Sequence, residues 1–289
     1  MSEMDGKVVL ITGATSGLGK VVARELAKKH TTVVIAGRDP ARTRATVNEI
    51  EEQVGHPAAE GLVADLSSMG EVSRLATEFQ RRYTRLDVLI NNVGAIFPQR
   101  RTTVDGVERT FALNHLSQFL LTNLLLDALR AGAPSRIVNV SSRAHEGSTI
   151  TFDNLQGEHG YGILGGRAYS QSKLANIMFA YELARRLAGT GVTANAVHPG
   201  TVATSFGENN GGLMGFAMRI FHRFAITPEE GADTIIYLAS SPQVEGVTGQ
   251  YWEKRRSIQS SPASHDESAQ KRLWDVSARM TGSAAPAHV

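Results

Sequence analysis

Tyr169 and Lys173 have the types and the spacing of an acid–base pair. They lie four residues apart in the stretch GRAYSQSKLANIMFAYELARRL, and on a helix two residues so spaced share one face. A cation beside a phenol favours the phenolate and lowers its pKa from about 10 toward working pH. Such a tyrosine can give a proton to a carbonyl oxygen or take one from an alcohol. An isolated pair of this kind is usually surface decoration, so the rest of the chain has to decide.

A glycine-rich turn follows the first strand-like run of the sequence. VVLIT (8–12) precedes TGATSGLGK (12–20). Glycines between a buried strand and a helix let the backbone turn tightly and approach an anion, which then sits at the positive end of the helix dipole. At the first strand and first helix, such a turn predicts dinucleotide binding. The residues expected to contact the dinucleotide are Gly13, Thr15, Ser16, Gly17, Leu18 and Gly19.

The end of the second strand-like run indicates which nicotinamide cofactor is preferred. An acidic residue there would bind the ribose 2′-OH and repel a 2′-phosphate. VVIAGRD instead has Gly37 followed by Arg38, whose guanidinium can bind a phosphate through two hydrogen bonds. Asp39 lies one step further and is expected to begin a turn with Pro40. The sequence therefore predicts NADP(H) rather than NAD(H). Arg42 is either a second phosphate ligand or part of a solvated helix face.

The elements that must position these residues alternate along the chain. Helix-length stretches separate seven short apolar or β-branched runs, at 8–12, 32–37, 61–65, 87–91, 136–140, 193–198 and 249–253. These runs are continuous, as in strands buried on both faces, and no linker rich in Pro, Gly or Ser divides the chain. We expect one α/β domain over 5–280, of the Rossmann type, in which helices cover both faces of a doubly wound parallel sheet of about seven strands. Residues 281–289 are expected to be a frayed tail.

Composition and charge exclude several classes of protein. Hydrophobic residues make up 42% and charged residues 20% of the chain, as in a packed globular protein. The net charge of +2 is too small for nucleic-acid binding. No cysteine is present, and the histidines lack metal-ligand spacing, so no metal site is predicted. The sequence has no signal-peptide pattern and no apolar run of roughly 18 residues, so no transmembrane segment and a cytoplasmic location are expected.

Further motifs occur in order along nearly the whole chain, and together they resemble those of a known family. Seven motifs together resemble the short-chain dehydrogenase/reductase family. They are TGATSGLG (12–19), ADL (64–66), NNVG (91–94), NHLSQF (114–119), VNVSS (138–142), YSQSK (169–173) and HPGTVAT (198–204). Four further stretches are similar to the retinol-dehydrogenase-like branch: AHEG after the serine pair, SKLANIMFAYELARRL, TPEEGA (227–232) and RLWDVS (272–277).

The resemblance implies four catalytic residues, Asn114, Ser142, Tyr169 and Lys173. In this family Tyr169 would be the acid/base, and Lys173 would also hydrogen-bond the nicotinamide ribose. Ser142 would polarise the substrate oxygen, and Asn114 would hold a proton-relay water near the lysine. Ser141, next to Ser142, is expected to be structural.

The resemblance also implies further contacts with NADP(H). Besides Tyr169 and Lys173, these are Asp65 and Leu66 beside the adenine, Asn91, Val93 and Gly94 on the cofactor floor, and Pro199, Gly200, Val202 and Thr204 near the nicotinamide. Family members usually carry alanine where this chain has Val93. The β-branched side chain is expected to narrow the floor slightly.

Residues 205–226 are expected to meet the substrate, because ligands bind beyond the carboxyl ends of parallel strands. After a glycine-rich start, Leu213, Phe216, Ile220 and Phe224 recur at helical spacing. We interpret the segment as a lid over a lipophilic substrate. A packed amphipathic helix and a membrane-surface helix are the alternatives.

Residues 254–280 extend beyond the shortest family members. Ser264 and Glu267 have capping-box spacing before a helix that contains Leu273 and Val276. This C-terminal extension is expected to fold back either near the active-site rim or at a subunit contact.

The whole pattern predicts an NADP(H)-dependent carbonyl reductase or alcohol dehydrogenase that acts on an apolar substrate, such as a retinoid, steroid, aldehyde or polyketide-like ketone. A homodimer or homotetramer is compatible with it. The alternative is a non-catalytic NADP(H)-sensing or interaction protein on the same fold. Such proteins commonly lose one catalytic residue, whereas here all four are present. An epimerase or dehydratase would need a larger sugar-nucleotide domain.

Overall fold

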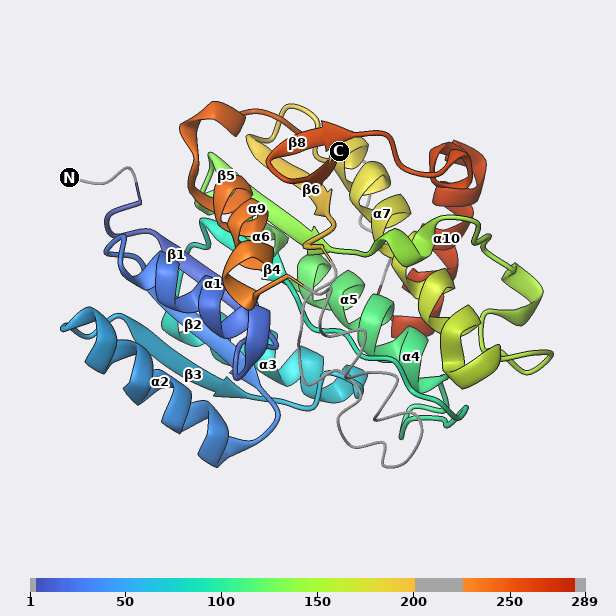
Figure 1. The fold of residues 1–289 in the computed structure, drawn as a ribbon, viewed down its shortest axis with the longest axis horizontal. Coiled ribbons are helices and arrows are strands. Elements are labelled where there is room, and N and C mark those ends of the chain that lie inside the picture. Colours follow the sequence, from blue (N-terminus) through green and yellow to red (C-terminus); the bar gives the residue numbers. More distant parts are fainter. Residues whose placement is uncertain (1–3, 201–225, 284–289) are drawn as a thin grey trace.

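A single sheet forms the centre of the computed structural model, which describes residues 4–200 and 226–283 (Figure 1). The strands are β1 (Val8–Thr12), β2 (Thr32–Gly37), β3 (Ala59–Val63), β4 (Val88–Asn91), β5 (Ser135–Val140), β6 (Val192–Val197), β7 (Tyr251–Glu253) and β8 (Arg256–Ile258). Their order is β3-β2-β1-β4-β5-β6-β7-β8, and β1 to β7 run parallel. The chain reverses its direction of winding between β1 and β4. This is the predicted doubly wound topology.

The eighth strand was not predicted. β8 pairs antiparallel with β7, so that Glu253 lies opposite Arg256. The two residues between them, Lys254 and Arg255, have φ of 48° and 57°, the left-handed conformations that a two-residue hairpin requires. Glycine or asparagine usually marks such a turn. Because neither is present here, no turn signal marked the hairpin in the sequence.

Helices cover both faces of the sheet, as predicted. They are α1 (Gly17–Ala27), α2 (Pro40–Val54), α3 (Met69–Arg82), α4 (Arg109–Phe111), α5 (Ser117–Leu124), α6 (Leu126–Ala131), α7 (Gly166–Arg186), α9 (Pro228–Ser240) and α10 (Glu267–Thr281). Neighbouring residues of β1 point to opposite faces. Ile11 lies in the apolar layer with α1, α2 and α9, whereas Leu10 lies in the layer with α3, α5, α7 and α10.

The C-terminal helix α10 packs against α7 and α5 of the same chain. Its Trp274 is buried, with the ring 4.9 Å from that of Phe119. The predicted capping box is wrong. Asp266 caps the helix instead and accepts the Ala269 N–H at 2.9 Å, because Ser264 turns inward and donates to the Ser261 carbonyl.

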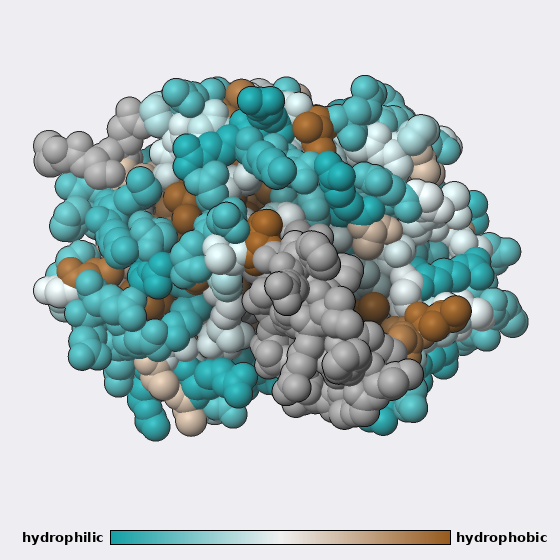
Figure 2. All heavy atoms as spheres, in the orientation of Figure 1, coloured by the Kyte–Doolittle hydropathy of each residue, from teal (hydrophilic) through white to brown (hydrophobic). Residues whose placement is uncertain are grey.

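Most apolar side chains lie beside the sheet rather than on the surface. On the face drawn in Figure 2, hydrophilic residues dominate and apolar ones form small separate groups. The large hydrophobic side chains exposed in the described ranges are Val104, Leu124, Ile163 and Leu164. Within residues 4–200 and 226–283, no helix is both long and apolar enough to cross a membrane. The predicted lid, apart from Ile226, lies outside these ranges, as do Val202 and Thr204.

Candidate active site

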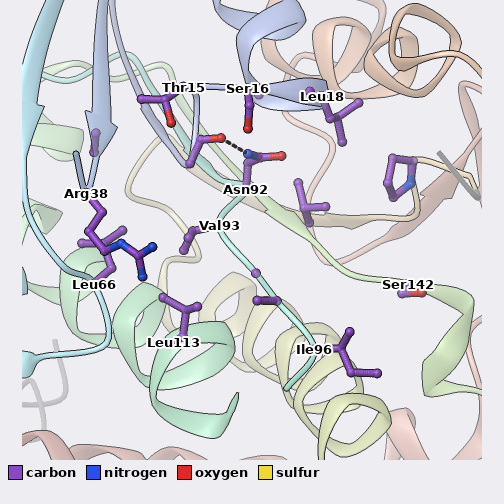
Figure 3. A pocket seen from close by; sticks show the side chains of 18 of the residues that line it. Thr15, Ser16, Leu18, Arg38, Leu66, Asn92, Val93, Ile96, Leu113 and Ser142 are labelled. Atoms are coloured by element: carbon purple, nitrogen blue, oxygen red, sulfur yellow. Dashed lines mark hydrogen bonds between the residues drawn. The ribbon is translucent and has the colours of Figure 1, made fainter. Parts of the chain in front are cut away.

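A cavity of about 910 Å³ opens at the carboxyl ends of the central strands. Arg38 and Leu66 lie at one end of it and Ser142 at the other (Figure 3). The predicted site residues that line it are Gly13, Thr15, Ser16, Gly17, Leu18, Gly19, Arg38, Asp65, Leu66, Val93, Gly94, Ser142, Tyr169, Lys173, Pro199 and Gly200. The cavity lies where the order of strands reverses, which is where doubly wound sheets bind dinucleotides.

The glycine turn forms one wall of the cavity. Gly13 and Gly17 have φ of 67° and 50°, which favour glycine. Ser16, the N-cap of α1, makes no side-chain hydrogen bond to the helix, and the first turn carries no acidic residue. The positive end of the helix dipole is therefore not neutralised by its own first turn. This arrangement suits an anion such as a pyrophosphate.

Asn92 supports the turn from beneath (Figure 3). Its Nδ2 donates to the carbonyls of Thr12 and Gly13, at 2.8 and 3.1 Å. Asn91, rather than Asn92, was the residue predicted from the sequence to line the cofactor floor. Asn91 is buried away from the cavity, where its Nδ2 donates to Thr122 Oγ1 at 3.0 Å and Asn139 Oδ1 at 2.8 Å.

Gly19→Ala is expected to destabilise the turn. An added Cβ would lie 2.6 Å from the Gly13 carbonyl oxygen and 2.9 Å from Ala14 Cα, and overpacking against backbone lowers the free energy of unfolding by about 1–3 kcal/mol. Urea unfolding measures the change. The control is Gly70→Ala in α3, where the nearest atom to the added Cβ is 3.8 Å away. Equal unfolding free energies for the two variants would contradict the close packing of the turn.

Positive charge gathers at the end of β2. Arg38, Arg42 and Arg109 all line the cavity. Asp39 begins the turn as predicted: its Oδ1 accepts the Arg42 N–H at 2.8 Å and caps α2. Burial raises the pKa of Asp65, but hydrogen bonds from Ser67 and the charges of Arg38 and Arg109 outweigh burial and hold that pKa below its usual value.

Arg109 was not among the predicted site residues. Its guanidinium carbon lies 4.1 Å from the centre of the Phe97 ring, in a cation–π contact. A lone arginine at the start of a helix is indistinguishable in sequence from one on a solvated face.

Tyr169 and Lys173 share one face of α7, as their spacing predicted. Lys173 Nζ lies 5.5 Å from the centre of the Tyr169 ring and donates to the Val140 carbonyl at 3.2 Å. The side chain of Ser142 hydrogen-bonds Tyr169. Ser141 Oγ donates to the Lys173 carbonyl at 2.7 Å, so its predicted structural role is confirmed. Tyr169, Lys173 and Ser142 therefore meet at one end of the cavity.

Burial sets the proton affinity of both groups. It raises the pKa of Tyr169 to about 12, although the hydrogen bond with Ser142 acts in the opposite direction. It lowers the pKa of Lys173 to about 8. The predicted lowering of the tyrosine pKa is wrong for the protein alone, because desolvation of the phenolate outweighs the hydrogen bond from Ser142.

Asn114 lies behind the cavity wall, in a π-helical turn (Ala112–Leu116) of the kind that often marks functional sites. Its Nδ2 donates to the Ala95 carbonyl at 2.9 Å and to Ser172 Oγ at 3.0 Å, and its Oδ1 accepts the Ala95 N–H at 2.8 Å. A Cβ on Gly94 would lie 3.1 Å from Lys173 Nζ and 3.5 Å from Asn114 Oδ1. Glycine at this position therefore allows the lysine and the asparagine to approach the same point.

His198 is a further cavity residue, and no role in the site was predicted for it. Burial is the main cause that lowers its pKa to about 4, so the imidazole is neutral at physiological pH. Among the residues that the structure describes, no group of three or more His, Cys, Asp or Glu side chains is placed to hold a metal ion.

Known proteins are similar to this chain in sequence and in fold. The family model described as short chain dehydrogenase matches residues 7–212. Retinol dehydrogenase 14 of Mus musculus is 43% identical over 293 residues, covering 96% of this chain and 87% of that protein. A putative uncharacterized protein from Mycobacterium Paratuberculosis has a structure with a TM-score of 0.80 and 32% identity, covering 99% of this chain and 97% of its own.

A solved structure with cofactor is also similar. The Pseudomonas aeruginosa RhlG/NADP active-site complex has a TM-score of 0.68 and 26% identity, covering 86% of this chain and 94% of its own. With the glycine turn, the Tyr169–Lys173 pair and these similarities on one chain, the protein belongs to the short-chain dehydrogenase family of NAD(P)-dependent oxidoreductases, in its retinol-dehydrogenase-like branch.

Proposed function

We propose that the protein transfers hydride between NADP(H) and the carbonyl or alcohol group of an apolar substrate. The observation that carries the proposal is the meeting of Ser142, Tyr169 and buried Lys173 in the same cavity as the glycine turn. Retinoids, steroids, aldehydes and polyketide-like ketones are the proposed substrate classes. Similarity to a retinol dehydrogenase supports the first of these.

Tyr169 is the proposed acid/base. When bound, the nicotinamide supplies or accepts the hydride. With a pKa of about 12, the phenol keeps its proton at neutral pH and can donate it to a carbonyl oxygen as that oxygen gains charge. Ser142 hydrogen-bonds this phenol, so both hydroxyl groups can face one substrate oxygen. Lys173, when protonated, stabilises the phenolate that remains.

Asn114 is proposed to hold the relay water through one atom only. Both hydrogens of its amide are used, by Ala95 and Ser172. Oδ1 accepts the Ala95 N–H and keeps one further lone pair. Because Gly94 has no Cβ, there is space beside both Oδ1 and Lys173 Nζ. A water bonded to Oδ1 would therefore lie next to the lysine.

The preference for NADP(H) over NAD(H) rests on Arg38. The carboxylate that follows it, Asp39, lines the cavity too, but its Oδ1 accepts the Arg42 N–H and caps α2, and the arginine rather than the acid comes directly after β2. Arg38 and Arg42 line the same end of the cavity and can bind the 2′-phosphate together. The narrowing of the floor by Val93, which lines the cavity, stays a prediction.

Arg38→Ala is expected to weaken NADPH binding by about 10- to 100-fold, because a hydrogen bond between charged groups contributes about 1.5–3 kcal/mol. The affinity for NADH should hardly change. Arg44→Ala is the matched control, since Arg44 is exposed on α2, six residues after Arg38, and does not line the cavity. Fluorescence titration with both cofactors gives the dissociation constants. An equal loss for NADPH and NADH would remove Arg38 from phosphate recognition.

The proposed activity is tested by a screen of NADPH oxidation across aldehydes and ketones of graded size and polarity, with all-trans-retinal included. Turnover that rises with the apolar surface of the substrate supports the proposal. Tight NADPH binding without turnover of any of them would instead favour the NADP(H)-sensing alternative. The cytoplasmic location and the homo-oligomeric state stay predictions.

A further inference from the structure

His145 connects the C-terminal extension to the segment that carries Ser142. It ends a short 3-10 turn (Arg143–His145) directly after β5 and is completely buried. Its Nδ1 lies 2.7 Å from the Ser142 carbonyl oxygen, and its Nε2 lies 3.1 Å from the backbone nitrogen of Ser261. The ring also packs edge-on against Tyr251, with 5.1 Å between ring centres. Both ring nitrogens therefore have backbone partners. The partner in the extension, Ser261, is 116 residues away from His145 in the sequence.

These partners fix which nitrogen carries the proton. A backbone N–H can only donate, so Nε2 must accept from Ser261. A neutral imidazole has one N–H, and this one is consequently on Nδ1, where it donates to the Ser142 carbonyl. Burial lowers the pKa of His145, although the bond to Ser142 and the charge of Glu146 act in the opposite direction. The neutral ring thus accepts a hydrogen bond from the Ser261 N–H and donates one to the Ser142 carbonyl oxygen.

The turn holds Ser142 at both its carbonyl and its hydroxyl. The carbonyl accepts the backbone N–H of His145 at 3.1 Å as well as Nδ1–H. The hydroxyl Oγ accepts the Ala144 N–H at 3.1 Å. That leaves the hydroxyl proton and one lone pair of Ser142 for Tyr169 and the substrate. The direction of this hydroxyl therefore depends on the turn that His145 closes.

The residues around Ser261 in the extension are themselves held in place by hydrogen bonds and packing. Ser260 Oγ lies 2.7 Å from Tyr181 Oη on α7 and 2.6 Å from Ser264 Oγ. Leu273 and Trp274 of α10 are buried against the body of the protein. The Ser261 N–H is thus held by a segment that packs on the same helix as Tyr169 and Lys173.

We propose that His145 is a positioning residue for Ser142, and that the C-terminal extension sets the geometry of the active site through the Ser261 N–H. This inference rests on the proposed function, in which Ser142 orients the substrate oxygen. It gives the extension a role in catalysis although none of its residues lines the cavity.

Two pairs of variants test two links separately. The first link is the hydrogen bond from the Ser261 N–H to His145 Nε2, and the second is the one from His145 Nδ1–H to the Ser142 carbonyl oxygen. Ser261 has φ of −60°, which proline adopts, so Ser261→Pro removes the N–H, and its Cδ, in the place of that hydrogen, pushes the His145 ring away from Ser261. Ser261→Ala keeps the N–H and gives the reference value. His145→Gln places an amide oxygen near the position of Nε2 but lacks the donor to Ser142. His145→Asn places an amide N–H near the position of Nδ1 but lacks the acceptor for Ser261.

The expected losses follow from the link that each variant breaks. The kcat of Ser261→Pro should be about tenfold below that of Ser261→Ala, and His145→Gln should fall up to about 100-fold below wild type, because a misplacement near 1 Å can have that effect. His145→Asn breaks the same link as Ser261→Pro and should lose a similar factor. The dissociation constant for NADPH should stay constant in all four. Equal kcat for the two Ser261 variants, or losses that only follow the fall in Tm, would overturn the proposal.

A readout without turnover separates this inference from the proposed function. The ¹⁵N chemical shifts of His145 in the whole protein should show a protonated Nδ1 and an unprotonated Nε2. The Nε2–H tautomer would overturn the inference whatever the activity. If the wild-type protein transfers no hydride but has the Nδ1–H tautomer, the proposed function is wrong. The hydrogen bonds from Ser261 through His145 to Ser142 would still be supported.

Discussion

Tyr169→Phe is expected to lower kcat by about 10²- to 10⁴-fold, the range that a positioned general acid or base contributes. The exchange removes one hydroxyl and keeps the aromatic ring. Lys173 therefore retains its cation–π contact with that ring, and the glycine turn and Arg38 are untouched. NADPH should consequently bind almost as tightly as it does to the wild type.

The measurement separates chemistry from binding. Single-turnover oxidation of NADPH gives the rate of the chemical step, and fluorescence titration gives the affinity for the cofactor. Tyr237→Phe is the matched control, because Tyr237 Oη donates to Gln243 Oε1 just after the end of α9 and the residue does not line the cavity. A Tyr169→Phe protein that keeps a tenth or more of the wild-type rate would place the proton donor elsewhere.

Most of the structural features that could be predicted from the sequence are marked by local patterns of residues. Continuous apolar runs such as VVLIT mark strands that are buried on both faces, and β1 is buried at every position. The glycine turn and the four-residue spacing of Tyr169 and Lys173 are likewise local. For such features the chain order and the known topology are enough to bring distant segments to one end of the sheet.

What could not be predicted depends on side-chain direction and on distant contacts. Asn91 and Asn92 are neighbours, yet successive residues at the end of a strand point to opposite sides. The sequence alone did not fix which of the two supports the glycine turn. The raised pKa of Tyr169 depends on burial, which no spacing reveals. His145 and Ser261 are 116 residues apart, so their contact depends on how the extension packs.

Lys173→Met is expected to inactivate the protein and to stabilise it at the same time. Loss of the buried cation should lower kcat by about 10²-fold or more, the effect of removing one preorganised charge or donor from a transition state. The fall in the lysine pKa from 10.5 to about 8 corresponds to about 3 kcal/mol of unfavourable charge burial. Methionine fills a similar volume without that charge. The Val140 carbonyl still has Asn176 Nδ2 as a partner, at 3.4 Å.

The stabilisation should depend on pH in a direction fixed by these two pKa values. Below pH 8 the lysine is protonated in both the folded and the unfolded chain, and the folded state carries the full penalty. Between about pH 8 and 10.5 the unfolded chain binds more protons than the folded one, so the free energy of unfolding of the wild type rises with pH. Above pH 10.5 the penalty is gone.

Urea unfolding of both proteins at pH 7 and pH 10 tests this dependence. The advantage of Lys173→Met should be about 3 kcal/mol at pH 7 and about 1 kcal/mol at pH 10, by the same linkage. Lys271→Met is the control, because Lys271 is exposed on α10, and surface substitutions change stability by no more than about 0.5 kcal/mol. An advantage that is absent at pH 7, or that does not shrink by pH 10, would mean that Lys173 is not buried as a cation. If Lys173 is buried as a cation, lysine at this position lowers the stability of the protein, as expected where a residue serves catalysis rather than folding.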